Sequence, residues 1–79
     1  MRATKDLAKQ QVDVFGQLLV ERAVISDIVP VEKRGEQHYS FDILDDKFPY
    51  PVECAGIKEL ALVLTAMWSA YQKAWNFLI

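Results

Sequence analysis

His38 and Cys54 are the two residues of this 79-residue chain whose side chains suit nucleophilic catalysis. A thiol becomes a strong nucleophile when a neighbouring base lies within hydrogen-bond reach and takes its proton. The chain holds one histidine and one cysteine, so a dyad of this kind would have to use this pair. The secondary structure around the two residues decides whether their side chains can meet.

The segments that carry these residues alternate between apolar and polar side chains. Residues 37–43 and 48–54 both have this period of two, which is typical of half-buried strands. Between them, residues 44–47 read Leu-Asp-Asp-Lys and have the composition of a turn. The sequence therefore predicts a hairpin with one apolar face. That face comprises Tyr39, Phe41, Ile43, Phe48, Tyr50, Val52 and Cys54.

The pattern also predicts the register of the hairpin. Pairing Ile43 with Phe48 places Tyr39 opposite Val52, and every apolar residue then falls on one face. A slip by one residue would turn half of them towards water. A four-residue loop is therefore expected.

This register separates the two candidate catalytic residues. Cys54 lies on the apolar face opposite Gln37, whereas His38 lies on the solvent face opposite Glu53. We therefore expect a small buried thiol and a surface pair of His38 with Glu53 in place of a catalytic dyad. The prediction is that the protein is not an enzyme.

Two prolines indicate how the second strand is placed in the sheet. Pro49 and Pro51 have the same parity, so their missing N–H groups fall along the same edge. Proline is tolerated there when the edge is unpaired, which predicts an edge strand over residues 48–54. The sequence leaves open whether the two peptide bonds before these prolines are cis or trans.

Charged residues form two further candidate sites. Asp42, Asp45 and Asp46 cluster at the predicted hairpin tip, but a calcium loop needs more oxygen ligands and a glycine at its sharp turn. We therefore expect solvated turn acids, no metal site and no cofactor. Lys33 and Arg34 form a small basic tip that lies beside two glutamates, which makes a weak phosphate site.

The overall charge is −2 and the pI is near 5.2. The basic residues are scattered among acids, so we do not expect nucleic acid to be the main partner. The single cysteine excludes an intrachain disulfide and fits a reducing, cytoplasmic setting.

The final third of the chain predicts a helix over about residues 57–78, after Gly56. A first apolar stripe on it comprises Ile57, Ala61, Leu64, Trp68, Tyr71, Trp75 and Leu78. The three aromatic residues of this stripe suit either a core or an anchor patch for a partner. Polar residues interrupt the second half of the helix, so we do not expect it to span a membrane.

A second apolar stripe lies beside the first and includes Leu60. One stripe suffices to cover a three-stranded sheet, so the second needs either the N-terminal segment or another subunit. We predict a homodimer interface on this stripe. The predicted interface residues are Val63, Met67, Ala70, Ala74 and Phe77.

The upstream segment allows two interpretations. Residues 19–31 are predicted as the first strand of a meander, with Pro30 weakening its end. The alternative is a helix from Thr4 to about Arg22, because apolar residues also recur there at helical spacing. Residues 1–16 stay undecided. The predicted fold class is α+β: a three-stranded antiparallel meander packed on one long C-terminal helix, in a single domain of residues 1–79.

The run Leu-Leu-Val-Glu-Arg-Ala-Val-Ile at residues 18–25, the hairpin after it, and Ala55-Gly56-Ile57 before the helix resemble a family of small uncharacterised bacterial proteins. That family has the order strand, hairpin, helix. The resemblance implies the meander and helix, and it implies no activity.

A chain of this size buries only about 60–65% of its unfolded surface, so association is a natural supplement to its stability. We therefore expect a small cytoplasmic adaptor or inhibitor that binds protein and forms a homodimer. The alternative is a phage- or plasmid-type accessory protein with weak nucleic-acid binding.

Overall fold

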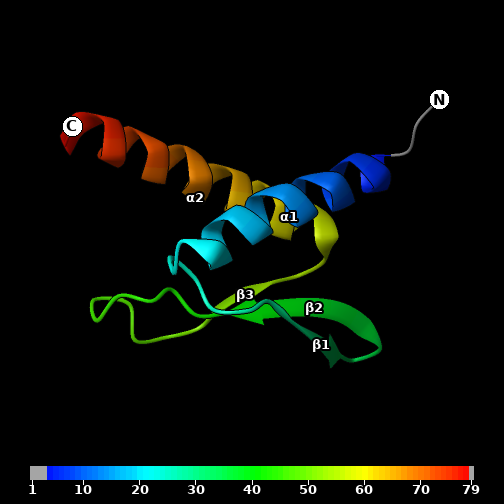
Figure 1. The fold of residues 1–79 in the computed structure, drawn as a ribbon. Coiled ribbons are helices and arrows are strands. Elements are labelled where there is room, and N and C mark those ends of the chain that lie inside the picture. The colour runs from blue at the N-terminus through cyan, green and yellow to red at the C-terminus, as the bar shows by residue number, and fades with distance from the viewer. Residues whose placement is uncertain (1–3, 79) are drawn as a thin grey trace.

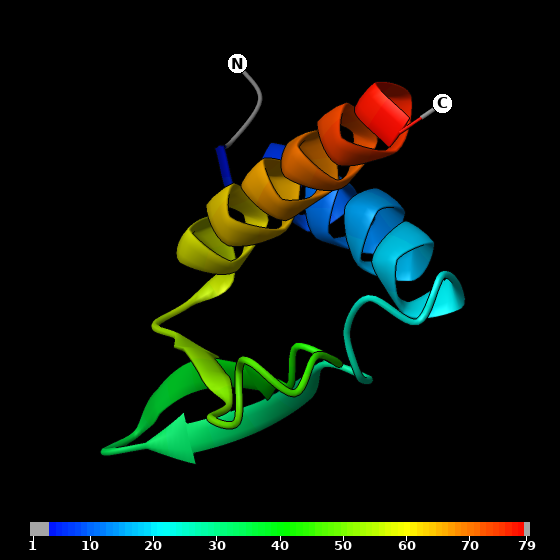
Figure 2. The same ribbon diagram turned by 90° about the vertical axis from the view of Figure 1, so that its left-hand side faces the viewer.

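The computed structural model describes the backbone of residues 4–78 and the side chains of residues 5–74. The order of elements is α1 (Thr4–Glu21), β1 (Val29–Lys33), β2 (Glu36–Phe41), β3 (Val52–Cys54) and α2 (Ile57–Leu78). The three strands form an antiparallel meander in the order β1-β2-β3. The two helices pack against each other over one face of this sheet (Figures 1 and 2). The fold class is α+β, as predicted.

The N-terminal segment forms a helix, and the strand predicted from residue 19 is wrong. The helix α1 continues to Glu21 and β1 begins only at Val29. The apolar residues of this segment recur at helical spacing, so a helix can turn them as one row towards the core. This burial favours the helix over the strand. In that row, Ala8 and Leu19 are buried, and Val12 and Phe15 pack on the core or beside it.

Residue Ala23 ends α1 in a left-handed conformation, with φ of 58°. The N–H of Val24 donates to the carbonyl of Leu19 at 2.9 Å, and the N–H of Ala23 donates to the carbonyl of Val20 at 3.0 Å. These two bonds make a Schellman motif, which usually has glycine at the position of Ala23. The chain leaves the helix here and turns towards the sheet.

The turn between β1 and β2 consists of Arg34 and Gly35. Their φ angles are 51° and 77°, and Lys33 pairs with Glu36 on either side of them. Two central residues with positive φ define a type I′ turn, whose twist matches that of the flanking strands.

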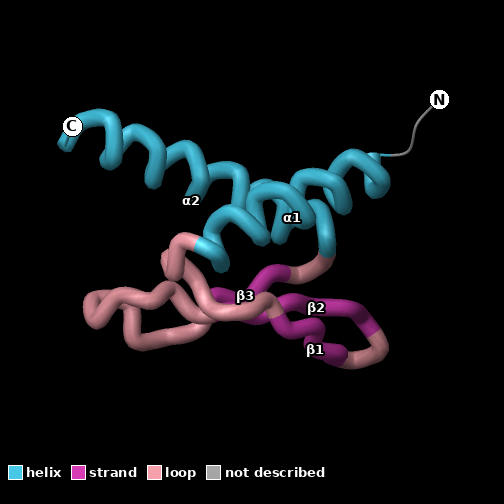
Figure 3. Tube along the Cα trace, viewed as in Figure 1, coloured by secondary structure: helices cyan, strands magenta, loops and turns pink. Residues whose placement is uncertain are grey.

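The predicted register of the second hairpin is wrong by two residues. Tyr39 lies opposite Cys54 and Phe41 opposite Val52, so residues 42–51 form a long connection (Figure 3). Ile43 forms a bridge with Ile25 instead of pairing with Phe48. A shift of two residues preserves which face each side chain occupies, so the apolar face holds within the paired strands.

The shifted register leaves both prolines of this region outside the paired strands. Pro49 and Pro51 lie in the connection, where no ladder N–H is needed. Between them, Tyr50 is 79% exposed, and Phe48 is exposed as well, so both leave the apolar face on which they were predicted. The edge position of β3 is confirmed by the strand order, and every peptide bond of the described residues is trans.

The free edge of β1 also carries a proline. Pro30 lies opposite Tyr39. Counted from the two-residue turn, that position is one of the pairs without ladder hydrogen bonds, so the nitrogen of Pro30 faces away from β2. The outer edge therefore lacks the N–H of position 30, and the other edge consists of the three residues of β3.

The buried core draws on every layer of the fold. Its fully or almost fully buried members are Leu19, Ile25, Phe41, Cys54, Leu60 and Leu64. The predicted C-terminal helix is confirmed as α2, which begins after Gly56 with φ of 112°. The carboxylate of Glu59 accepts a hydrogen bond from the N–H of Ala55 at 2.9 Å and fixes the entry to this helix.

Helix α2 extends past the end of α1. A Cβ placed on Gly16 would lie 3.5 Å from Leu64, and the guanidinium of Arg22 lies over the ring of Trp68. The end of α1 is therefore level with Trp68, whereas α2 continues to Leu78. Figure 1 shows this last part of α2 projecting beyond both α1 and the strands. We call residues 69–78 the α2 overhang.

Candidate functional site

The structure places His38 and Cys54 on opposite faces of the sheet. Cys54 lies opposite Tyr39 on the face that packs on the helices. His38 is the neighbour of Tyr39 on β2, so its side chain points to the other face of the sheet. Burial raises the pKa of the Cys54 thiol, and the nearby charges of Glu59 and Glu53 raise this pKa further. A protonated thiol without a neighbouring base is a poor nucleophile.

The predicted pair of His38 with Glu53 is wrong, because the shifted register places Glu53 opposite Ser40. The Nδ1 atom of His38 lies 3.2 Å from the carbonyl oxygen of Glu36. Glu53 instead forms an ion pair with Lys33, with 2.6 Å between Nζ and Oε2. The hydrogen bond from Lys33 is the main cause that lowers the pKa of Glu53, and the charges of Lys33 and His38 also lower it. Lys33, one of the two cations of the basic tip, is therefore engaged by an exposed ion pair with Glu53 of strand β3.

The acidic residues of the long connection do not converge on a common point. The carboxylate of Asp45 accepts the N–H of Lys47 at 2.9 Å, and the backbone N–H of Asp42 donates to the hydroxyl of Ser26 at 2.8 Å. Within residues 5–74, no group of three or more His, Cys, Asp or Glu side chains could hold a metal ion. Over the described part of the chain, neither helix has the length and hydropathy of a membrane span.

The predicted interface on α2 divides into two parts. Val63 and Met67 are half-buried and pack on the core. Ala70 and Ala74 are exposed on the α2 overhang, and the side chain of Phe77 lies outside the described side chains. The exposed part of the predicted interface therefore begins after Met67, at Ala70.

The aromatic residues of α2 join the two helices. The rings of Trp68 and Tyr71 stack with 5.7 Å between their centroids, and the guanidinium of Arg22 lies 5.2 Å from the centroid of the Trp68 ring. Trp68 also packs on the core. The side chain of Trp75 lies outside the described side chains. Trp68 therefore forms the last described contact of α2 with the end of α1, and Tyr71 stacks on it from the first turn of the overhang.

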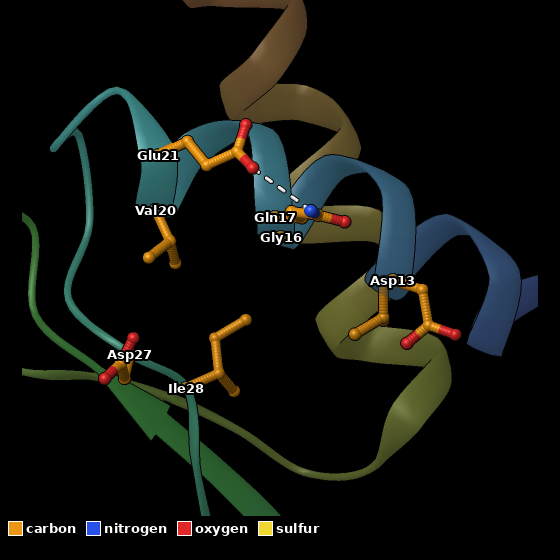
Figure 4. A pocket seen from close by; sticks show the side chains of 8 residues that line it. Asp13, Gly16, Gln17, Val20, Glu21, Asp27 and Ile28 are labelled. Carbon is orange, nitrogen blue, oxygen red and sulfur yellow. Dashed lines mark hydrogen bonds between the residues drawn. The ribbon is translucent and has the colours of Figure 1, made fainter.

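An apolar groove that the sequence did not predict lies between α1 and residues 27–28. Figure 4 shows Val20 and Ile28 facing each other across it, with Asp13 and Asp27 at its sides and the Glu21 carboxylate on its rim, directed towards Gln17. The groove has a volume of about 330 Å³. Gln17 donates a hydrogen bond to Glu21 at 3.1 Å on its outer side. In the sequence, the groove residues of α1 recur at four-residue spacing. This spacing indicates a common surface only if residues 12–21 are helical, which the sequence left open.

No protein-family model, curated protein or solved structure matches the chain.

Proposed function

We propose that the protein is a non-enzymatic protein–protein interaction module, an adaptor or inhibitor, that forms a homodimer through the α2 overhang. The observation that carries this proposal is the unequal reach of the two helices. α1 ends level with Trp68, and α2 continues to Leu78 without a described element beside it.

The exposed residues of the overhang suit the approach of another helix. Ala70 and Ala74 are four residues apart, so they lie on the same side of α2, next to the apolar side chain of Met67. Small side chains allow two helix backbones to approach closely, and Met67 supplies apolar contact area at the edge of this surface. A second helix would therefore extend the existing core.

A second copy of this chain is the occupant that the proposal names. A two-fold dimer presents the same patch from both subunits, so the patch must not repel itself. Lys73 carries the only formal charge in residues 60–79, and two such patches therefore meet without a cluster of like charges. The small size of the domain gives dimerisation a stabilising role.

Light scattering across a concentration series tests this proposal with the variant Ala70→Glu/Ala74→Glu. Both positions are exposed in the single chain, so the domain should stay folded. Two carboxylates on each side of the interface should weaken dimerisation by at least about tenfold, because they would be buried without partners. Wild-type protein should have the mass of a dimer.

Ser69→Glu/Gln72→Glu is the matched control. It adds the same charge to exposed positions of the same helical turns, away from the Ala70 side, and it should leave the dimer intact. A wild-type monomer over the whole concentration range would overturn the proposal. Equal dimerisation of all three proteins would place the interface elsewhere and would equally overturn it.

A further inference from the structure

The groove between α1 and residues 27–28 combines an apolar floor with a negatively charged mouth. Val12, Val20 and Ile28 pack against the core at its base and also line the groove. Gly16 lies among them and adds no side chain. The volume of about 330 Å³ is at the small end of the range of ligand pockets, about 300–1,000 Å³. This is room for one or two apolar side chains of a partner.

The charged residues of the mouth are all acids. Asp13, Glu21 and Asp27 are exposed, and no lysine or arginine lines the groove. Within residues 5–74, the structure has one ion pair, between Lys33 and Glu53. None of the three carboxylates of the mouth is therefore paired with a cation there. The groove therefore attracts positive charge around an apolar centre.

We infer that this groove binds a segment of a partner protein that inserts an apolar side chain and flanks it with lysine or arginine. An apolar floor gives a bare metal ion no ligands, and three carboxylates repel an acidic segment. A second copy of this chain is a poorer match, because the exposed apolar side chains near lysines in its described residues, Leu7 and Phe48, also have an aspartate within two positions. The partner is thus a different protein.

This inference goes beyond the proposed dimer and does not depend on it. The groove and the α2 overhang share no residue. A chain with both surfaces would bind its own copy at one and a basic segment at the other, which is the arrangement that an adaptor requires.

NMR titration of ¹⁵N-labelled protein with the peptide Lys-Arg-Leu-Leu-Lys-Arg tests the inference. The peptide has blocked termini, and its leucines and cations supply the two features of the groove's partner. Saturable shifts are expected at the amides of Gly16, Val20 and Ile28, with a dissociation constant of about 1 mM or below. Binding should weaken between about 0.1 M and about 1 M salt, because exposed charges are screened.

The variant Asp13→Asn/Glu21→Gln/Asp27→Asn removes the charge of the mouth and keeps the side-chain shapes. Its affinity for the peptide should fall by about tenfold, since exposed charge pairs each contribute modestly. The control variant Glu32→Gln/Glu36→Gln/Asp46→Asn changes the net charge equally at exposed positions outside the groove. It should bind the peptide almost as tightly as the wild type.

Four results would overturn the inference. They are the absence of saturable shifts in the groove at about 1 mM peptide, equal loss of affinity in the two variants, equal binding of Glu-Asp-Leu-Leu-Glu-Asp, and equal binding of Lys-Arg-Ser-Ser-Lys-Arg. The last result would mean that charge alone attracts the peptide and that the apolar floor takes no part.

Discussion

The guanidinium of Arg22 lies 5.2 Å from the centroid of the Trp68 ring, one residue beyond the end of α1. Arg22 also donates a hydrogen bond to the carbonyl of Leu18 at 3.4 Å, and Trp68 stacks on Tyr71. The contact joins the last turn of α1 to α2 at the point where the two helices part. The contact therefore marks where the uncovered part of α2 begins.

Replacing Arg22 with alanine should lower the free energy of unfolding by about 0.5–1 kcal/mol, the range of an exposed cation–π contact. Urea denaturation at neutral pH measures this loss. Lys9→Ala is the control, because Lys9 is an exposed cation of the same helix that lies over no aromatic ring within residues 5–74. Equal losses in the two variants would show that the contact with Trp68 adds nothing to stability.

The substitution Ala23→Gly should stabilise the protein by about 0.5–1 kcal/mol. Ala23 has φ of 58°, which is a costly conformation for a residue with a Cβ and an easy one for glycine. The greater freedom of glycine in the unfolded chain offsets part of this gain. Thermal and urea unfolding measure the change. Ala23→Val should destabilise the protein, because a β-branched side chain fits this conformation worst, and a loss of stability in the glycine variant would contradict the argument.

The lowered pKa of Glu53 should depend on Lys33. In the variant Lys33→Met, the pKa of Glu53 should rise towards the value of 4.5 for an unperturbed carboxyl. An NMR titration of the side-chain carboxyl carbon measures it in both proteins. A pKa that does not change with the substitution would mean that the pair with Lys33 is not formed in solution.

The sign of the linked stability follows from the direction of the pKa shift. A carboxyl whose pKa is lower in the folded state stabilises the fold above its unfolded pKa, and this contribution is lost as the pH falls through the folded pKa. For Glu53 the loss begins near pH 4.5 and continues below it. The effect on stability should be small, because Glu53 is exposed to solvent.

The periodicity of the sequence was enough to predict α2 and the apolar side of β2 and β3. Side-chain parity survives a shift of two residues, so Phe41 and Cys54 face the core although their predicted partners are wrong. The register itself depends on the bridge between Ile25 and Ile43, which are far apart in the sequence. No local pattern encodes that contact.

The two candidate surfaces depend still more on tertiary structure. The groove appears only when α1 is helical and Ile28 lies against it, whereas the same residues, taken as a strand, show scattered solvated acids. The five predicted interface residues share one stripe of α2, but the position of the end of α1 decides which of them are free. Val63 and Met67 are thereby part of the core, and Ala70 and Ala74 are exposed.

The two edges of the sheet limit how large an assembly of this chain can become. Pro30 interrupts the outer edge of β1, and β3 offers only three residues. Strand-by-strand addition, which leads to fibrils, therefore has a poor template at both edges. The sheet edges therefore disfavour open-ended growth, and the dimer that we propose through α2 would be a closed complex.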